Sequence, residues 1–310
     1  MTRIVAIGEC MVEMAPLPDA GTYRMGFAGD TLNTAWYLAK LLKDRAQVDY
    51  FTAVGTDAVS DQMLAFLDRA SIGTASILRR DDRTPGLYTI QLQDGERSFS
   101  YWRGQSAART LAQAVQDIDT ALRAADIAYI SGITLAILPE ADRATLLQAL
   151  EQFRSAGGEV VFDPNLRPKL WPDTGTMTDA IMRAARLSDI VLPSHEDEAT
   201  WFGDATPLDT AERYALEGAK IVVVKNGPGE IVMLDDGKTS RHHPETVTDA
   251  VDTTAAGDSF NAGFLANRII GAPLDQAVET AARLAALVVS YPGALVNEAV
   301  SSGSSGDMLD

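Results

Sequence analysis

Residues 127–163 read IAYISGITLAILPEADRATLLQALEQFRSAGGEVVFD. The stretch begins with one short apolar run, Ile127–Ser131, and ends with another, Glu159–Asp163, and both runs are typical of buried strands. Between them, residues 140–156 have the apolar spacing of an amphipathic helix. A helix that joins two buried strands indicates a crossover between parallel strands of one sheet.

The same alternation of strand and helix extends in both directions along the chain. Buried strands are predicted at residues 4–7, 50–55, 190–192 and 221–225, and helices at residues 31–42, 60–70, 177–186, 259–270 and 274–289. We therefore predict an α/β fold with a mostly parallel central sheet that is covered by helices on both faces.

One segment departs from this alternation. Residues 88–101 alternate with a period of two around Asp94-Gly95, which is a hairpin turn signal, and no helix follows. The pattern predicts a small antiparallel piece that projects from the main sheet. From the pattern alone it is either an extra edge sheet or a lid over a site.

Composition limits the classes of partner. The chain has 310 residues, 46% hydrophobic and 22% charged, with a formal net charge of −17. Such an acidic surface repels phosphate backbones and anionic lipids, so nucleic acid and membranes are poor partners and an anionic substrate would need a local cationic pocket. The single cysteine, Cys10, excludes an intramolecular disulfide and is expected to be a small buried side chain. With no apolar stretch that resembles a signal peptide or a membrane span, we expect a cytoplasmic protein.

Residues 252–260, DTTAAGDSF, carry the strongest chemical signal. Small residues at Ala255, Ala256 and Gly257 allow a close approach of the backbone to a ligand, and the helix that follows presents free N–H groups. Together they predict an anion hole suited to a phosphoryl group in transfer. Asp258, at the mouth of this hole, is placed to accept a proton from an attacking hydroxyl. The alternative is that Asp258 is only an N-cap residue.

This stretch resembles the C-terminal signature of the ribokinase-like (PfkB) carbohydrate kinases, with Ala255 in place of the first glycine of the usual Gly-Ala-Gly-Asp. Residues 26–35, GFAGDTLNTA, are similar to the N-terminal signature Gly-Gly-x-x-x-Asn, with Ala28 in place of its first glycine. The resemblance implies that Gly29, Asp30 and Asn33 hold substrate hydroxyls. Their alternative role is a turn and N-cap before the helix.

The resemblance also implies an architecture. The expected fold is a ribokinase-like three-layer α/β/α sandwich with a small antiparallel β lid. We expect residues 1–300 to form a single kinase domain, the lid to come from about residues 10–27 and 86–103, and residues 301–310 to form a flexible tail. In this family the lid also makes a dimer contact, so a homodimer or a higher homo-oligomer is expected.

Further stretches resemble the members of the family that phosphorylate a keto-deoxy sugar acid. They are residues 7–11, 85–88, 100–103, 131–138 and 162–171, and the similarity runs to about Val296. A guanidinium matches a carboxylate in a bidentate manner, so Arg103 and Arg167 are expected to bind the acid group. Tyr88 and Tyr101 lie near the two ends of the hairpin and are expected to cover the sugar. Each arginine could instead form a surface ion pair.

Nucleotide binding is assigned by resemblance to a glycine-rich turn after a strand. This turn contains Lys225, Asn226, Gly227 and Gly229, and Asn165 and Gly257 are expected to contact the phosphates. It is not a Gly-x-x-x-x-Gly-Lys-Ser/Thr phosphate loop.

The expected cofactors are ATP and Mg²⁺, because magnesium bridges the phosphate oxygens in this reaction. The family's Asn-x-x-Glu magnesium motif has Ser194 and Asp197 at its two ends here, so the ligands of the metal are left unassigned. By resemblance, Asp252 and Thr254 are weak candidates for holding a monovalent cation such as K⁺.

The sequence thus predicts an ATP-dependent kinase for a sugar acid, with Asp258 as the general base. Two alternatives remain open, a kinase of the same fold for a neutral sugar such as fructose or ribose, and a non-catalytic sugar sensor. A nicotinamide dehydrogenase is disfavoured, since the first strand is not followed by Gly-x-Gly-x-x-Gly.

Overall fold

The computed structural model describes residues 1–19, 21–93 and 96–301. Its main element is a nine-stranded sheet with the strand order β15-β14-β13-β12-β11-β10-β1-β4-β6. Neighbouring strands from β13 to β6 are parallel, whereas β14 and β15 form an antiparallel edge. The strands are β1 (Thr2–Ile7), β4 (Ala46–Phe51), β6 (Ile72–Gly73), β10 (Ile127–Ser131), β11 (Glu159–Asp163), β12 (Ile190–Val191), β13 (Ile221–Val224), β14 (Ile231–Asp235) and β15 (Lys238–His242).

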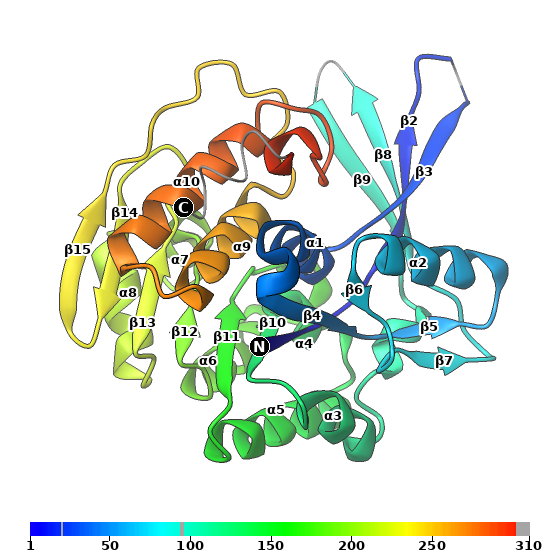
Figure 1. Ribbon diagram of the computed structural model, residues 1–310, viewed down its shortest axis with the longest axis horizontal. Coiled ribbons are helices and arrows are strands. Elements are labelled where there is room, and N and C mark those ends of the chain that lie inside the picture. Colours follow the sequence, from blue (N-terminus) through cyan, green and yellow to red (C-terminus); the bar gives the residue numbers. More distant parts are fainter. Residues whose placement is uncertain (20, 94–95, 302–310) are drawn as a thin grey trace.

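Helices cover both faces of this sheet, as predicted (Figure 1). Alternate side chains of β1 show the division, because Ile4 and Ala6 pack in one core cluster while Val5 and Ile7 pack in the other. The first face is covered by α1 (Asp30–Leu42), α2 (Ala58–Arg69), α9 (Ala256–Ile269) and α10 (Leu274–Val288). The second face is covered by α3 (Val115–Leu122), α4 (Gly132–Ile137), α5 (Glu140–Ser155), α6 (Thr174–Arg186), α7 (His195–Trp201) and α8 (Pro207–Leu216). Short 3₁₀ turns complete the chain at η1 (Lys43–Arg45), η2 (Ala107–Thr110), η3 (Pro168–Leu170) and η4 (Glu298–Val300).

A second, four-stranded sheet projects from the main body beside α2 (Figure 1). It contains β2 (Met11–Pro16), β3 (Tyr23–Ala28), β8 (Leu87–Gln93) and β9 (Glu96–Trp102) in the order β3-β2-β8-β9. We call it the lid sheet. Two antiparallel pairs are joined by a parallel contact between β2 and β8, so the predicted antiparallel piece is in fact mixed at its centre. The predicted turn at Asp94-Gly95, and the tail beyond Ser301, lie outside the described residues.

Several elements differ from the sequence prediction, which did not include β14, α3, α4, α7 or α8. The predicted strand at residues 50–55 is divided, because β4 ends at Phe51 and β5 (Ala53–Gly55) pairs with β7 (Leu78–Arg80) in a separate two-stranded sheet. The antiparallel edge strand β15 was missed, since its sequence, KTSRH, has no alternation of apolar and polar residues.

Cys10 is buried, as predicted. None of the helices in the described part of the chain combines the length and the apolar character that crossing a membrane requires.

Candidate active site

A cavity of about 510 Å³ lies where the carboxyl ends of the central parallel strands meet the lid sheet. This edge of an open α/β sheet is the usual place for a ligand. Most of the predicted site residues line it, namely Gly29, Asp30, Asn33, Tyr88, Tyr101, Arg103, Asn165, Arg167, Lys225, Thr254, Ala255, Ala256, Gly257 and Asp258. The fold thus brings together residues from both signatures, which are more than 200 positions apart in the sequence.

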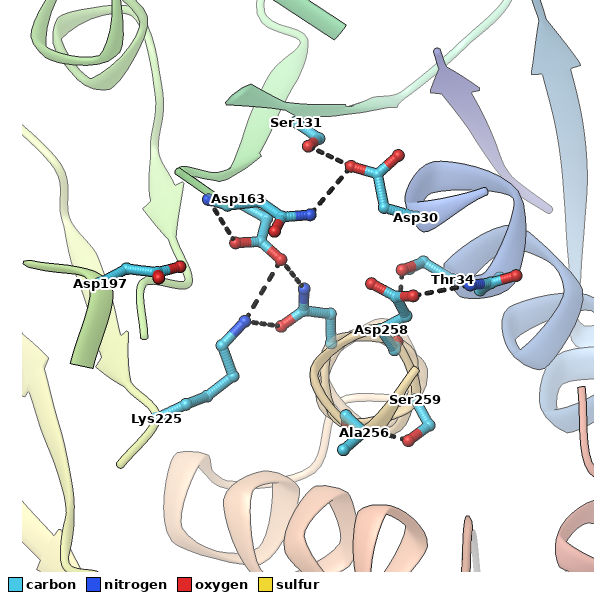
Figure 2. Close-up of polar contacts among 12 residues, drawn as sticks. Asp30, Thr34, Ser131, Asp163, Asp197, Lys225, Ala256, Asp258 and Ser259 are labelled. Atoms are coloured by element: carbon cyan, nitrogen blue, oxygen red, sulfur yellow. Dashed lines mark hydrogen bonds and ion pairs between the residues drawn. The ribbon is translucent and has the colours of Figure 1, made fainter. Parts of the chain in front are cut away.

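Asp258 lies in the first turn of α9 and is held by α1 (Figure 2). The Asn33 Nδ2 group donates a hydrogen bond to the Asp258 carboxylate at 2.8 Å, and the Thr34 hydroxyl donates to the Asp258 backbone carbonyl at 3.2 Å. The N-cap of α9 is Ala255, whose φ of 60° is in the left-handed region. The N-cap alternative for Asp258 is therefore wrong, and its carboxylate lines the cavity instead.

The pKa of Asp258 is raised to about 8, mainly by burial and also by the nearby carboxylates of Asp30 and Asp163, while the Asn33 hydrogen bond and the Lys225 ammonium act in the opposite direction. Three carboxylates therefore meet at this end of the sheet. A carboxyl group that still binds a proton near neutral pH becomes a competent base as soon as a cation or a hydroxyl partner stabilises its charge.

This arrangement makes a prediction about stability. Because the pKa of Asp258 is raised from 3.8 to about 8 in the folded state, its contribution destabilises the fold increasingly as pH rises from about 4 to 8. Asp258→Asn removes this charge, so we expect its Tm to exceed that of the wild type by about 2–4 °C at pH 8, the shift that about 1 kcal/mol produces. The gain should be smaller at pH 5. Calorimetry at the two pH values checks this, and an equal or lower Tm at pH 8 would contradict it.

Asp30, the first residue of α1, is fixed by two other strands of the sheet. Its Oδ2 atom accepts hydrogen bonds from the Ser131 hydroxyl at the end of β10 and, at 3.0 Å, from the Asn165 side chain after β11 (Figure 2). Burial raises the pKa of this carboxyl as well. The preceding residue must be glycine, because a Cβ at Gly29 would lie 2.2 Å from the backbone oxygen of Glu9.

Lys225 supplies a buried positive charge to the same cavity. Its Nζ atom lies 3.3 Å from Asp163 Oδ2 and 2.9 Å from Asn261 Oδ1 (Figure 2). The Asn261 amide group also donates to Asp163 Oδ2 at 2.7 Å, which fixes both partners of the lysine. A Cβ built at Gly257 would lie 3.7 Å from Nζ, so the ammonium lies beside the N-terminus of α9. Ammonium and free N–H groups together favour an anion such as a phosphoryl group.

The lid side of the cavity carries the predicted arginines and tyrosines. Arg103 donates from both Nε and Nη2 to the Oε2 atom of Glu9, which is buried. The Tyr88 hydroxyl donates to Glu13, and the Tyr88 and Tyr101 rings pack together with centroids 5.7 Å apart. The surface-pair alternative is therefore wrong for Arg103, whose ion pair lies inside the cavity.

Arg167 lines the cavity from the segment that follows β11. Its side chain is 50% exposed, and its Nη1 atom lies 3.4 Å from Asp197 Oδ2. Its guanidinium thus forms a partly exposed ion pair, as the surface-pair alternative expected. It still lines the cavity.

Glu9 and Asp163 also line the cavity, although they were not predicted as site residues. Glu9 follows β1 and Asp163 is the last residue of β11, so both lie at the carboxyl edge of the sheet. Their signal was therefore present, since polar side chains at that edge of a parallel sheet point toward the ligand site. Met11, Phe99 and Ile133 also line the cavity and carry no polar signal in the sequence.

Some predicted residues do not line the cavity. Asn226, Gly227 and Gly229 form a tight turn after β13, in which the Gly229 amide donates to the Asn226 carbonyl at 2.8 Å. Asp252 accepts hydrogen bonds from the amides of Thr254 (3.0 Å) and Gly293 (2.6 Å), so its visible role is to tie its loop to the segment after α10.

The described residues contain no group of three or more His, Cys, Asp or Glu side chains that could hold a metal ion by themselves. The cavity does contain the carboxylates of Asp163 and Asp197. One or two carboxylates suffice for Mg²⁺ when a nucleotide supplies phosphate oxygens, so these residues fit a metal that arrives with its nucleotide.

The family follows from comparison with known proteins. The model for "pfkB family carbohydrate kinase" matches residues 1–299. The chain therefore belongs to the pfkB family of carbohydrate kinases, as the two signatures indicated.

Named relatives and solved structures agree with this assignment. The chain is 38% identical to the 2-dehydro-3-deoxygluconokinase of Haemophilus influenzae, over 96% of each chain. Among solved structures it is similar to a PfkB protein from Polaromonas sp. JS666, with a TM-score of 0.83 and 29% identity over 94% of this chain and 97% of that one. A fructokinase from Xylella fastidiosa with bound ATP has the same fold, with a TM-score of 0.84 and 22% identity over 99% and 97% of the two chains. The predicted ribokinase-like fold is confirmed.

Proposed function

We propose that this protein transfers the γ-phosphoryl group of ATP to the primary hydroxyl of 2-keto-3-deoxygluconate (2-dehydro-3-deoxygluconate) and forms the 6-phosphate. The observation that carries the proposal is one cavity that contains both Asp258 at the N-terminus of α9 and two arginines, Arg103 and Arg167. A neutral sugar has no use for two guanidinium groups, whereas a carboxylate does. The names of the relatives support the same substrate.

In the proposed mechanism Asp258 accepts the proton of the attacking hydroxyl as the bond to phosphorus forms. The N–H groups of Ala255, Gly257 and Asp258 and the Lys225 ammonium stabilise the negative charge that develops on the transferred group, whereas the Ala256 N–H donates to the Thr253 carbonyl. Mg²⁺ bound to the nucleotide would neutralise phosphate charge, with Asp163 and Asp197 as the residues that would hold it. Asp30 and Asn33 orient the sugar hydroxyls so that the reacting one faces Asp258.

The nucleotide occupies the side of the cavity at β13 in this proposal. Lys225 and Asn165 contact the phosphates, and Asn226, Gly227 and Gly229 border the nucleotide outside the acceptor cavity. A monovalent cation at Asp252 and Thr254 stays a prediction. Replacing K⁺ by tetramethylammonium in the assay tests it, because only a bound ion makes activity depend on the cation.

The carboxylate assignment predicts a selective effect on substrate affinity. Loss of one charge-assisted hydrogen-bonding group costs about 1.5–3 kcal/mol, so Arg167→Ala should raise the KM for the sugar acid about 10- to 100-fold with little change in kcat. Arg167→Lys keeps the charge but loses the planar fork, so its KM should lie between those of the wild type and Arg167→Ala. Steady-state kinetics measures both. An unchanged KM in Arg167→Ala would move recognition of the acid to another residue.

The product tests the reaction itself. Incubation with MgATP and 2-keto-3-deoxygluconate should give one new ³¹P NMR signal of a phosphomonoester, coupled to the two protons of a terminal CH₂ group. A phosphoester at a secondary carbon would contradict the assignment of the primary hydroxyl, and ADP formation without an ester would indicate hydrolysis.

We also propose that the lid sheet forms a homodimer. Register pairing puts Tyr88 and Tyr101 on its cavity face, so Trp102, Met25 and Tyr23 lie on the opposite face. These three side chains are exposed by 61%, 42% and 44%. Large apolar side chains gathered on one face of a sheet are typical of a protein interface.

This proposal predicts a change of mass in solution. Light scattering should give about twice the chain mass of 33.2 kDa for the wild type and a monomer for the double variant Met25→Asp/Trp102→Asp. Leu216→Asp changes an even more exposed apolar residue on α8 and should stay dimeric. A monomeric wild type, or a dimer that survives in the double variant, would contradict the lid interface.

A further inference from the structure

A second cavity, of about 750 Å³, lies on the face of the sheet opposite α1 and α9, between the end of α4, the start of α5, and α6. Four of its lining residues are arginines, which is unexpected in a chain with a net charge of −17. The lining residues are Arg109, Ala136, Leu138, Pro139, Glu140, Arg143, Leu170, Pro172, Thr176, Asp179, Met182, Arg183 and Arg186.

Arg143 forms the fixed part of this cavity. It is 6% exposed, and its Nε and Nη2 groups donate to the carbonyls of Leu135 (2.9 Å) and Leu138 (3.2 Å) at the end of α4. Its guanidinium also stacks on the Trp171 ring, 4.5 Å from the centroid. A buried guanidinium with carbonyl and ring partners is well oriented but keeps its full charge.

The other arginines add charge that the protein does not neutralise. Among the described residues, Arg109 and Arg183 have no side-chain hydrogen bond or ion pair, whereas Arg186 pairs with Glu217. After burial, the charge of Arg183 is the main cause that lowers the pKa of Arg143, which shows that the two guanidinium groups repel each other. Glu140 and Asp179 are exposed and offset only part of this charge.

Two segments connect this cavity to the active site. The short helix α4 begins beside Asp30, since its N-cap Ser131 hydrogen-bonds Asp30 and Ile133 lines the active cavity. At its other end Ala136 and the C-cap residue Leu138 line the second cavity. Residues 167–171 also extend from one cavity to the other, because Arg167 lines the active cavity and Leu170 lines the second one. Arg143 contacts both segments, through the carbonyls of α4 and the ring of Trp171.

We propose that the second cavity is a regulatory site for a small phosphorylated metabolite, with Arg109, Arg143 and Arg183 as its anion ligands. A phosphate group accepts bidentate hydrogen bonds from guanidinium groups and carries nearly two negative charges, which offsets the repulsion among these arginines. Because the ligand engages Arg143, its binding is coupled through α4 and residues 167–171 to the acceptor site.

The binding test uses 3-phosphoglycerate and inorganic phosphate as probes, measured by titration calorimetry without nucleotide and at constant ionic strength. We expect binding to the wild type and a loss of affinity of about 10-fold or more in Arg109→Gln/Arg183→Gln. Arg283→Gln, on the exposed side of α10, is the matched control and should bind as the wild type does. Equal affinity in the double variant, or no binding up to about 10 mM probe, would overturn the site.

A second pair of substitutions should raise, and not lower, the affinity for the probes. Glu140→Gln/Asp179→Asn removes the two carboxylates of the cavity, so we expect it to bind the probes several-fold more tightly. Weaker or unchanged binding in this variant would contradict the electrostatic argument, even if the arginine variant failed to fold.

The coupling is tested by kinetics. In the wild type 3-phosphoglycerate should change the KM for the sugar acid by about fivefold or more, and the arginine variant should lose this response while keeping its basal activity. An unchanged wild-type KM would overturn the coupling. This readout rests on the proposed function, but the calorimetric binding does not, so the two failures are distinguishable.

Discussion

Asp258→Asn should lower kcat by about 10²–10⁴-fold while the fold stays intact. The amide keeps the size of the side chain and can still hydrogen-bond Asn33, but it cannot accept a proton from the acceptor hydroxyl. The KM values should change little, because the proton transfer belongs to the transition state and not to binding. Single-turnover kinetics with saturating MgATP measures the chemical step directly.

The matched control is Asp275→Asn, which removes a carboxylate from the first turn of the neighbouring helix α10. Asp275 lies outside the active cavity, so this variant should keep wild-type kcat. Near-normal turnover in Asp258→Asn would remove Asp258 from the role of base. Equal losses in both variants would indicate a general effect on helix N-termini instead.

The second large effect is expected at Asp30. Asp30→Ala removes a carboxylate that we expect to hold substrate hydroxyls, and it leaves the Ser131 hydroxyl and the Asn165 amide without their shared acceptor. Each hydrogen bond to a charged group contributes about 1.5–3 kcal/mol, so kcat/KM for the sugar acid should fall by about 10²-fold or more. The effect should be mainly on KM for the sugar, with the KM for ATP nearly unchanged.

Asp30→Asn removes the charge of this side chain and keeps its shape, so it tests the effect of the charge alone. Among the neighbouring charges, the Asp30 carboxylate has the largest effect in raising the pKa of Asp258. Its neutralisation should therefore lower that pKa and move the rising limb of the kcat/KM profile toward lower pH. A limb that stays in place would contradict the electrostatic contact between these two carboxyls. Asp44→Asn, in the exposed turn η1 after α1, is the control.

Much of the fold could be predicted because its strands are buried on both faces. Runs such as Ile127–Ser131 and Glu159–Asp163 are apolar except at their ends, and their predicted bounds agree with β10 and β11. The division of residues 50–55 could not be predicted, because apolar character does not tell to which of two sheets a residue belongs. The polar edge strand β15 had no pattern to reveal it.

The candidate site was inferred from two signatures, and one cavity contains residues of both. The sequence could not predict which charged side chains from distant strands contact one another. The Arg103–Glu9 contact joins the lid sheet to β1, and the Lys225–Asp163 contact joins the ends of β13 and β11. Such contacts depend on the strand order, which local pattern does not specify.

The central claim is that a carboxylate on the acceptor is required. The most direct measurement is a coupled ADP-release assay with MgATP and, in parallel, 2-keto-3-deoxygluconate, gluconate, fructose and ribose. We predict strong activity with the keto-deoxy acid alone. A preference for fructose or ribose would keep the kinase and Asp258 but contradict the role of Arg103 and Arg167, and no activity with any of the four would favour a non-catalytic sugar sensor.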